Sequence, residues 1–383
     1  MKKSILFSVL IFLGCIGLRA QTNADGSYNI PVYVTNPTAY GPSFYNIYVG
    51  ISGVDNGALL PYMFDSGSPN FFSTAGTDGD SNPSTNGFFN FSGNGSPGYF
   101  YQTLTNTISL GNSNQVTYAS TENNVDWAQI RTVSNTVGTT NYPSNNILPD
   151  GTYGNFGAGL YGSSTLATIL TQIPLDPDLK QGYSINFTTN LTSTGAGSLT
   201  LGLSAEFLNT LSNLPGAIVL SMLPSGSNLP TADGAIPGYQ RPQVSNVAVS
   251  LTKDGTTITT NMPLVLDTGG GINQIIYDTD TNLIEYDHST NLIVSTNDQT
   301  IYNILDNTTA WGGEVVVDTN NPNGIRINSG GYFFQSNIVT FDLADGIVII
   351  DPDPVPEPSS SWMILLGGGL LLCLRFGNFK RNS

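Results

Sequence analysis

The stretch Phe64-Asp65-Ser66-Gly67-Ser68-Pro69-Asn70 has a second version later in the chain, Leu266-Asp267-Thr268-Gly269. In both copies an acid follows apolar residues and precedes a hydroxyl-bearing residue and a glycine. One copy alone is typical of a strand that runs into a tight turn, because Asp, Ser and Gly all favour turns. The pair indicates a shared site only if the remaining sequence forms two similar halves that bring the two carboxylates together.

The composition indicates a mostly β protein with room for two cores. A chain of 383 residues is long enough for two compact lobes. Its 18 Tyr and 18 Phe can fill those cores. The 43 Gly and 22 Pro, together with abundant Asn, Ser and Thr, favour short strands and turns over long helices.

Charge and cysteine content exclude several classes of function. The formal net charge is −16, and six of the 11 basic residues lie in the two terminal segments. The chain between those segments is therefore strongly acidic, which makes nucleic acid and anionic membrane surfaces poor partners, and we expect no nucleic-acid binding. Cys15 and Cys373 also lie at the ends, so no disulfide or thiol nucleophile is expected between them. With His288 as the only histidine, we expect no metal site and no cofactor.

The first 20 residues have the pattern of a secretory signal peptide. Met1-Lys2-Lys3 precedes an apolar run over residues 5–18, and the small residue Ala20 follows. We therefore expect export, with signal peptidase as a partner and cleavage after Ala20. Lipid attachment at Cys15 is the alternative, which the preceding Phe12 disfavours.

The C-terminal segment combines the motif Val355-Pro356-Glu357-Pro358, an apolar stretch over residues 362–374 and a basic tail. This order resembles the PEP-CTERM sorting signal of Gram-negative bacteria, which an exosortase cuts near the motif. The resemblance assigns residues 353–383 to a sorting signal with a short transmembrane helix, anchored transiently in the inner membrane. It implies a final location at the cell surface, in the outer envelope or in an extracellular matrix. A permanent C-terminal anchor is the alternative.

The first half of the remaining chain predicts strands that lead into the first Asp motif. Apolar and polar residues alternate over residues 29–52, and residues 59–64 run directly into Asp65. Residues 87–110 form two strand-like runs around the Gly-rich hairpin turn 92–98. Residues 164–173 have helical spacing. Strands follow at 183–187 and 198–203.

The second half repeats the order. Its predicted strands lie at 244–251, 264–266, 314–318, 324–328 and 339–350, with a hairpin turn at Lys253-Asp254-Gly255. A region rich in Pro, Gly and Ser over residues 205–240 separates the halves. We therefore predict an N-terminal β lobe over residues 21–204 and a C-terminal β lobe over residues 205–352.

Both Asp motifs resemble those of pepsin-like aspartic proteases, whose first motif typically reads F-D-T-G-S-S-N. Three further elements are similar to the family, and together they extend the resemblance over residues 29–351. They are Gly154-Asn155-Phe156-Gly157, like an apolar-apolar-Gly element; residues 195–202, like a strand near the lobe boundary; and Gly330-Gly331-Tyr332-Phe333 followed by residues 338–342, like the closing strands. The resemblance implies an all-β, bilobal fold of two related β lobes with few short helices.

The resemblance also implies an aspartic endopeptidase with Asp65 and Asp267 as its catalytic dyad. Two carboxyl groups that share one proton can activate water and protonate the substrate carbonyl without a metal. We expect Gly67 and Gly269 to let the backbone approach and donate N–H groups to the carboxylates. The hydroxyls of Ser66 and Thr268 would brace the two loops. Ser68 would hold the outer oxygen of Asp65.

Several positions depart from the family pattern. Gly270 stands where the family has Thr or Ser, Gly331 stands at its usual Asp, and Pro69 replaces Ser. Without a hydroxyl at Gly270, we expect Asp267 to carry the shared proton more often than Asp65. Phe91 is the candidate for the flap position, ahead of two tyrosines on the returning strand. The alternative function is a catalytically inactive pepsin-fold protein that binds a partner at the cell surface or in the matrix.

Two weaker motifs do not change this interpretation. Residues 157–162 match G-x-G-x-x-G, but no parallel βαβ unit surrounds them, so a turn is expected there. Residues 278–282 begin like a calcium loop, but they lack its following Gly and its closing Glu. We therefore predict a peptide or protein substrate for the chain and no bound ion.

Overall fold

The protein is described by a computed structural model, and the description below rests on part of the chain. The residues described are 22–34, 45–76, 85–90, 98–135, 138–141, 147–148, 151–160, 166–187, 196–270, 274–278, 281–287, 291–296, 299–305, 315–319, 324–335 and 337–352. All but the last of them belong to one compact unit that ends at Asp351.

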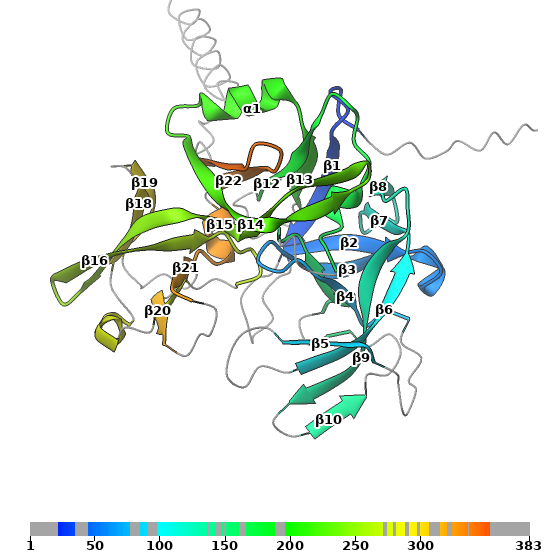
Figure 1. Cartoon of the computed structure of the whole chain (residues 1–383), viewed down its shortest axis with the longest axis horizontal. Coiled ribbons are helices and arrows are strands. Elements are labelled where there is room, and N and C mark those ends of the chain that lie inside the picture. The colour runs from blue at the N-terminus through cyan, green and yellow to red at the C-terminus, as the bar shows by residue number, and fades with distance from the viewer. Residues whose placement is uncertain are drawn as a thin grey trace, which may run out of the picture. The chain divides into compact units, whose positions relative to one another are not determined.

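The first half of the chain is built from short strands, as its alternating pattern predicts (Figure 1). These strands are β1 (Tyr28–Val34), β2 (Tyr45–Ile51), β3 (Leu60–Asp65), β4 (Phe71–Ser73), β5 (Gly87–Asn90), β6 (Gly98–Asn106), β7 (Ile108–Gly111), β8 (Thr117–Ser120), β9 (Val125–Asn135), β10 (Gly138–Asn141), β11 (Gly154–Gly157), β12 (Lys180–Asn186) and β13 (Ala196–Leu203). The turn predicted at 92–98 falls largely outside the described residues, but β5 and β6 on either side of it pair antiparallel, as in a hairpin.

The second half contains longer strands and the one α-helix of the described residues. The elements are α1 (Ala205–Ser212), β14 (Ile218–Thr231), β15 (Gly234–Lys253), β16 (Thr256–Val265), β17 (Gln274–Tyr277), β18 (Asn291–Thr296), β19 (Gln299–Leu305), β20 (Val315–Asp318), β21 (Arg326–Asn328), β22 (Asn337–Asp342) and β23 (Ile347–Pro352). Short 3-10 helices lie at Asp55–Gly57, Leu170–Gln172, Thr281–Tyr286 and Gly331–Gln335.

The two halves repeat one arrangement of four strands. In the first, β11 runs parallel to β3 and antiparallel to β4, and β4 runs parallel to β9. In the second, β21 runs parallel to β16 and antiparallel to β17, and β17 runs parallel to β20. Each Asp motif follows the first strand of its set. The prediction of an all-β fold from two related halves is therefore confirmed.

Strand β14 connects the strands of the two halves. Its first residues pair with β23, which belongs with the strands of the first half, and the rest of it pairs with β15. The predicted turn at Lys253-Asp254-Gly255 joins β15 to β16, with Asp254 at φ 50° and Gly255 at φ 77°. Positive φ at both central residues is the geometry of a type I′ hairpin, which matches the twist of paired strands.

The helix predicted at residues 164–173 is wrong over its described part, 166–173. Only Leu170–Gln172 forms a single 3-10 turn there. The apolar residues of this segment are buried, but threonine hydroxyls bond distant backbone carbonyls instead of supporting a helix: Thr168 donates to Gly157 O and Thr171 to Pro230 O. The helical spacing reflected core packing of an irregular segment. Helix α1 was not predicted and lies inside the region assigned to the boundary.

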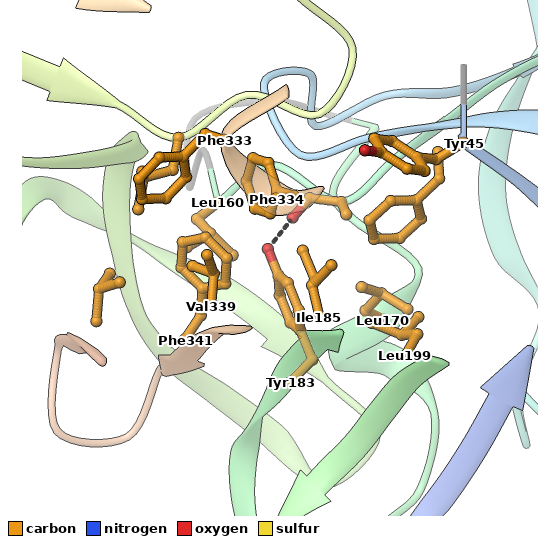
Figure 2. Close-up of a cluster of buried hydrophobic side chains, with 14 of the residues drawn as sticks. Tyr45, Leu160, Leu170, Tyr183, Ile185, Leu199, Phe333, Phe334, Val339 and Phe341 are labelled. Carbon is orange, nitrogen blue, oxygen red and sulfur yellow. Dashed lines mark hydrogen bonds between the residues drawn. The ribbon is translucent and has the colours of Figure 1, made fainter. Parts of the chain in front are cut away.

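A buried cluster of apolar side chains lies on the paired strands β12, β13 and β22 (Figure 2). Tyr183 is completely buried against Phe341, with ring centroids 4.9 Å apart, and its hydroxyl donates to Ala158 O at 2.8 Å. That bond satisfies the only polar atom of a side chain that otherwise contributes apolar area. It also fixes the backbone that follows β11, beside the first Asp motif.

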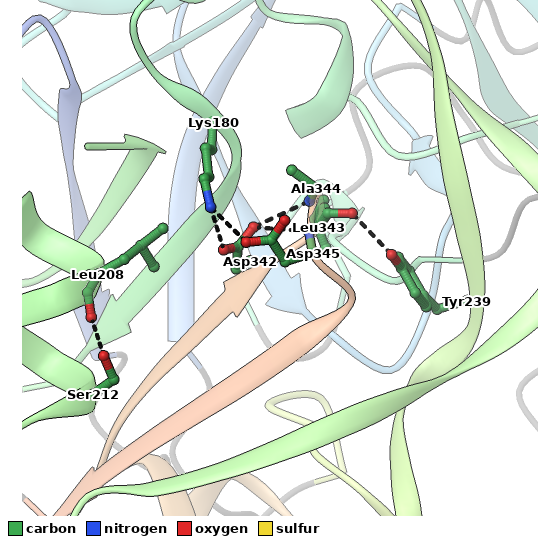
Figure 3. Close-up of polar contacts among 8 residues, drawn as sticks. All are labelled: Lys180, Leu208, Ser212, Tyr239, Asp342, Leu343, Ala344 and Asp345. Atoms are coloured by element: carbon green, nitrogen blue, oxygen red, sulfur yellow. Dashed lines mark hydrogen bonds and ion pairs between the residues drawn. The ribbon is translucent and has the colours of Figure 1, made fainter. Parts of the chain in front are cut away.

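A turn between β22 and β23 is held by polar contacts (Figure 3). Lys180 Nζ lies 2.5 Å from Asp345 and 3.5 Å from the buried Asp342 carboxylate. Tyr239 on β15 donates to Leu343 O at 2.9 Å. Because Lys180 and Asp345 are exposed, their ion pair contributes little to stability. The tyrosine bond ties the turn to β15.

Candidate active site

The two Asp motifs lie at the ends of β3 and β16, and parallel pairing fixes both loops. Gly157 is the register partner of Asp65 in the β11–β3 pair, and Asn328 is the partner of Val265 in the β21–β16 pair. The backbone carbonyl of Asp65 accepts from Ala158 N at 2.7 Å, and that of Val265 accepts from Ser329 N at 2.9 Å. Each carboxylate therefore emerges from a rigid strand end.

The hydroxyls of Ser66 and Thr268 cross between the two loops. Ser66 Oγ donates to Leu266 O at 2.8 Å and accepts from Thr268 N at 3.0 Å. Thr268 Oγ1 donates to Phe64 O at 2.8 Å and accepts from Ser66 N at 2.9 Å. All four bonds are buried and join residues of one half to residues of the other. The structure thus brings the two predicted motifs together with near-twofold symmetry.

The glycines lie close to the carboxylates. Gly67 N donates to Asp65 Oδ1 at 2.8 Å, and Gly269 N donates to Asp267 Oδ1 at 2.9 Å. A Cβ atom built on Gly67 would collide with the Asp267 carboxyl group, and one built on Gly269 would collide with that of Asp65. Glycine is therefore required at both positions because each loop packs over the other carboxylate.

Two asparagines bond the outer oxygens, Oδ2, of the two Asp carboxyl groups. The sequence analysis predicted neither asparagine as a site residue. Asn155 Nδ2 on β11 donates to Asp65 Oδ2 at 2.7 Å, and Asn328 Nδ2 on β21 donates to Asp267 Oδ2 at 2.6 Å. Both residues stand two positions before a glycine in short strands whose neighbours are buried. This shared Asn-x-Gly pattern is the signal that could have identified them, since a buried polar side chain must find a partner.

The predicted contact between Ser68 and the outer oxygen of Asp65 is not made. Among the described residues no hydrogen bond joins them; Ser68 Oγ instead accepts a long bond from Asn70 N at 3.5 Å. Ser68 O accepts from Gly159 N at 2.8 Å, which fixes the loop away from the carboxylate. The amide of Asn155 takes the place expected for the hydroxyl.

Gly270 does not leave Asp267 without support, contrary to expectation. A Cβ atom on Gly270 would lie 2.8 Å from Asn328 Oδ1, inside ordinary contact distance. A Thr or Ser at this position would therefore crowd the amide that already bonds Asp267. Gly270 leaves room for Asn328, whose amide bonds Asp267 in place of a hydroxyl. The missing hydroxyl therefore gives no reason to place the shared proton on Asp267.

The two carboxyl groups differ in burial. Asp65 is 5% exposed, whereas Asp267 is half-buried. Burial, followed by the neighbouring Asp267 carboxylate, raises the pKa of Asp65 well above its ordinary value. The two side chains are also in hydrogen-bonding contact. Such a pair retains one proton between them to higher pH than two isolated carboxyl groups would.

The flap candidate Phe91 lies outside the described residues. The strands on either side of it carry an aromatic cluster: Phe89 on β5 packs on Tyr99 and Tyr101 on β6, with ring centroids 5.2 and 5.7 Å apart. Phe72, just after the first Asp motif, lies 4.8 Å from Phe89. The base of the hairpin thus packs against β4, the strand that follows the first Asp motif.

No cluster of potential metal ligands occurs among the described residues. Of the segment that begins like a calcium loop, Asp278 is described and buried, whereas residues 279 and 280 lie outside the described part. His288 is also outside it. The site therefore consists of carboxyl, amide and hydroxyl groups.

Comparison with known proteins agrees with this architecture. The structure is similar to the crystal structure of an aspartic proteinase from Irpex lacteus, with a TM-score of 0.52 and 14% identity over 87% of this chain and 99% of that one. At that identity the similarity shows the fold, which is that of pepsin-like aspartic proteinases. A comparison with curated proteins finds no sequence match.

The C-terminal resemblance is confirmed. Residues 354–381 match the model of the PEP-CTERM protein-sorting motif. This motif marks the chain for export and for anchoring or processing at the cell surface by an exosortase. The apolar stretch 362–374 lies outside the described residues; within the described part, no helix has the length and hydropathy needed to cross a membrane.

Proposed function

We propose that this protein is an aspartic endopeptidase that acts at the cell surface, with Asp65 and Asp267 as its catalytic dyad. The observation that carries the proposal is the reciprocal set of bonds between Ser66 and Thr268, which supports two carboxyl groups in contact. A pair of acids with a purely structural role would not stabilise the fold by lying in contact, because two carboxylates at short range repel each other.

In the proposed reaction one carboxylate takes a proton from water, and the oxygen of that water attacks the peptide carbonyl carbon. The other carboxyl group donates its proton to the carbonyl oxygen, so the tetrahedral intermediate is a neutral diol. Collapse breaks the C–N bond: the carboxyl group protonated by water gives its proton to the leaving amine, and the other carboxylate takes a proton back from a diol hydroxyl, which restores the pair. The N–H groups of Gly67 and Gly269 hold the inner oxygens throughout, which supports orientation of the pair.

The proposal extends to processing of the chain. Signal peptidase would remove residues 1–20, and an exosortase would remove the segment after Val355-Pro356-Glu357-Pro358. The part between these cuts contains both lobes, 21–204 and 205–352, and would remain as the active enzyme. The mass of the mature protein reports both cuts directly.

The test is hydrolysis of casein and of short peptides at acid pH by the purified protein. Asp65→Asn and Asp267→Asn should each lower the rate to less than a few per cent of wild type, because each removes one member of an acid–base pair while the near-isosteric amide preserves the fold. A pepstatin-type inhibitor should block the wild type. Retained activity in either variant would refute the dyad. An inactive wild type that still binds peptides would favour the non-catalytic binding protein.

A further inference from the structure

Beyond the dyad itself, the two asparagines differ in a way that bears on the shared proton. Asn328 Oδ1 accepts from Gly330 N at 2.8 Å, so its amide is fixed with Nδ2 toward Asp267. The buried Oδ1 of Asn155 has no hydrogen-bond partner among the described residues. A half-turn of the Asn155 amide would therefore break no hydrogen bond of its Oδ1, and it would present an acceptor to Asp65 in place of a donor.

This difference decides which carboxyl group tolerates a proton on its outer oxygen. Both oxygens of Asp267 face fixed donors, Gly269 N and Asn328 Nδ2, and a protonated oxygen would oppose the second of them. Asp65 has one fixed donor, Gly67 N on Oδ1, while its Oδ2 faces the amide that can reverse. A carboxylic O–H at Asp65 Oδ2 would donate to Asn155 Oδ1.

The surroundings favour the same distribution of charge. Arg326 lies two residues before Asn328 on β21, is 3% exposed, and interacts electrostatically with Asp267. The groups that act on this guanidinium include Tyr277, whose ring centroid is 4.1 Å away, Asp318, and Gly324 O, which accepts from Nη1 at 3.0 Å. Among the described residues the only titratable group that acts on Asp65 is Asp267. A cation therefore supports charge on Asp267, whereas Asp65 is the more deeply buried partner.

We propose that Asn155 and Asn328 are positioning residues that assign the proton to Asp65 and the negative charge to Asp267. In the proposed reaction Asp267 is then the base that activates water, and Asp65 is the acid that protonates the carbonyl oxygen. The inference rests on the proposed function for these roles. The assignment of the proton itself does not depend on activity and can be measured without it.

The first measurement is a ¹³C NMR titration of the Asp carboxyl carbons in the intact protein. Asp65→Asn and Asp267→Asn identify the two signals. The Asp267 signal should move to the charged position first as pH rises, and the Asp65 signal should follow at higher pH. The reverse order would overturn the proposal. If the wild type hydrolyses no peptide but shows this order, the assignment stands and only the proposed function fails.

The second measurement compares Asn328→Ala with Asn155→Ala in the pH dependence of kcat/KM. The acid limb reports formation of the singly charged pair, so loss of the fixed donor to Asp267 should move it upward on the order of one pH unit. Asn155→Ala should move it much less, because that amide serves the protonated state equally well. An equal or larger upward shift with Asn155→Ala would overturn the proposal.

Matched serine variants keep the test decisive if an alanine variant folds poorly. Asn328→Ser and Asn155→Ser retain a polar side chain that is too short to reproduce the amide contact, and they should rank in the same order. Folding of every variant is checked by near-UV circular dichroism. Ser68→Ala is the matched control from the same loop: it should leave the acid limb in place, because Ser68 makes no bond to Asp65.

Discussion

At the scale of single residues, the crossed hydroxyls join the two halves at one point. Thr268 Oγ1 donates to Phe64 O and accepts from Ser66 N, and the side chain is 1% exposed. Removing the hydroxyl would leave a buried carbonyl and a buried N–H without partners, and the cost of such groups exceeds the net value of the bonds themselves. The brace is therefore costly to break even though it consists of only a few bonds.

Thr268→Ala should accordingly lower the free energy of unfolding by about 1–3 kcal/mol for each polar group left unsatisfied. Thr268→Ser is the control, since it keeps the hydroxyl and loses only a methyl group. Urea denaturation of both variants at one pH makes the comparison. Equal stability of the two variants would show that the hydroxyl does not carry the brace.

The sequence predicted the glycines that bond the inner carboxyl oxygens, Oδ1, and the two hydroxyl residues that link the loops. It missed the residues that bond the outer oxygens, Oδ2. Asp65, Asp267 and their glycines follow from a repeated motif whose chemistry needs them. Asn155 and Asn328 come from strands more than fifty residues away from the carboxylates they bond, so only the paired strands bring them there. The contact expected for Ser68 is not made, because its hydroxyl lies within the turn and accepts from Asn70 N instead.

At the scale of elements, strands were predicted better than helices. Alternation and turn residues located β1, β2, β3 and the β15–β16 hairpin, because these patterns are local. Helix α1 was missed in a region defined by its Pro, Gly and Ser content. Its start is nevertheless marked: Ser204 Oγ accepts from Phe207 N at 3.2 Å, and Leu208 and Leu211 pack against Ile349.

Ser204→Ala should therefore cost about 0.5–2 kcal/mol of stability, the usual value of a lost N-cap. Ser204→Thr should retain the cap, because it keeps a hydroxyl that can accept from Phe207 N and bond the neighbouring Asp25 carboxylate. Thermal denaturation of the three proteins gives the ranking, with the alanine variant lowest. An alanine variant as stable as wild type would mean that packing of Leu208 and Leu211 alone determines the helix start.

At the scale of the whole molecule, the candidate site and the net charge both lower the stability of the folded protein as pH rises. The chain has a formal net charge of −16, and self-repulsion of such a charge weakens the compact state as acids ionise. The dyad adds a specific contribution, because burial and Asp267 raise the pKa of Asp65 above the unfolded value of 3.8. The folded protein then binds more protons than the unfolded chain in the pH range between the two values.

The free energy of unfolding should consequently fall as pH rises from about 3.8 through the raised pKa of Asp65. One retained proton corresponds to a slope of about 1.4 kcal/mol per pH unit at most. Asp65→Asn removes this proton, so the variant should gain stability relative to wild type across that range, and the difference should vanish toward lower pH. Urea denaturation of both proteins from acid to neutral pH isolates the effect, since every ionisable residue other than Asp65 is common to the two proteins. A wild type that gains stability over the variant as pH rises would mean that Asp65 is charged in the folded protein, and would contradict both the raised pKa and its assignment as the acid of the pair.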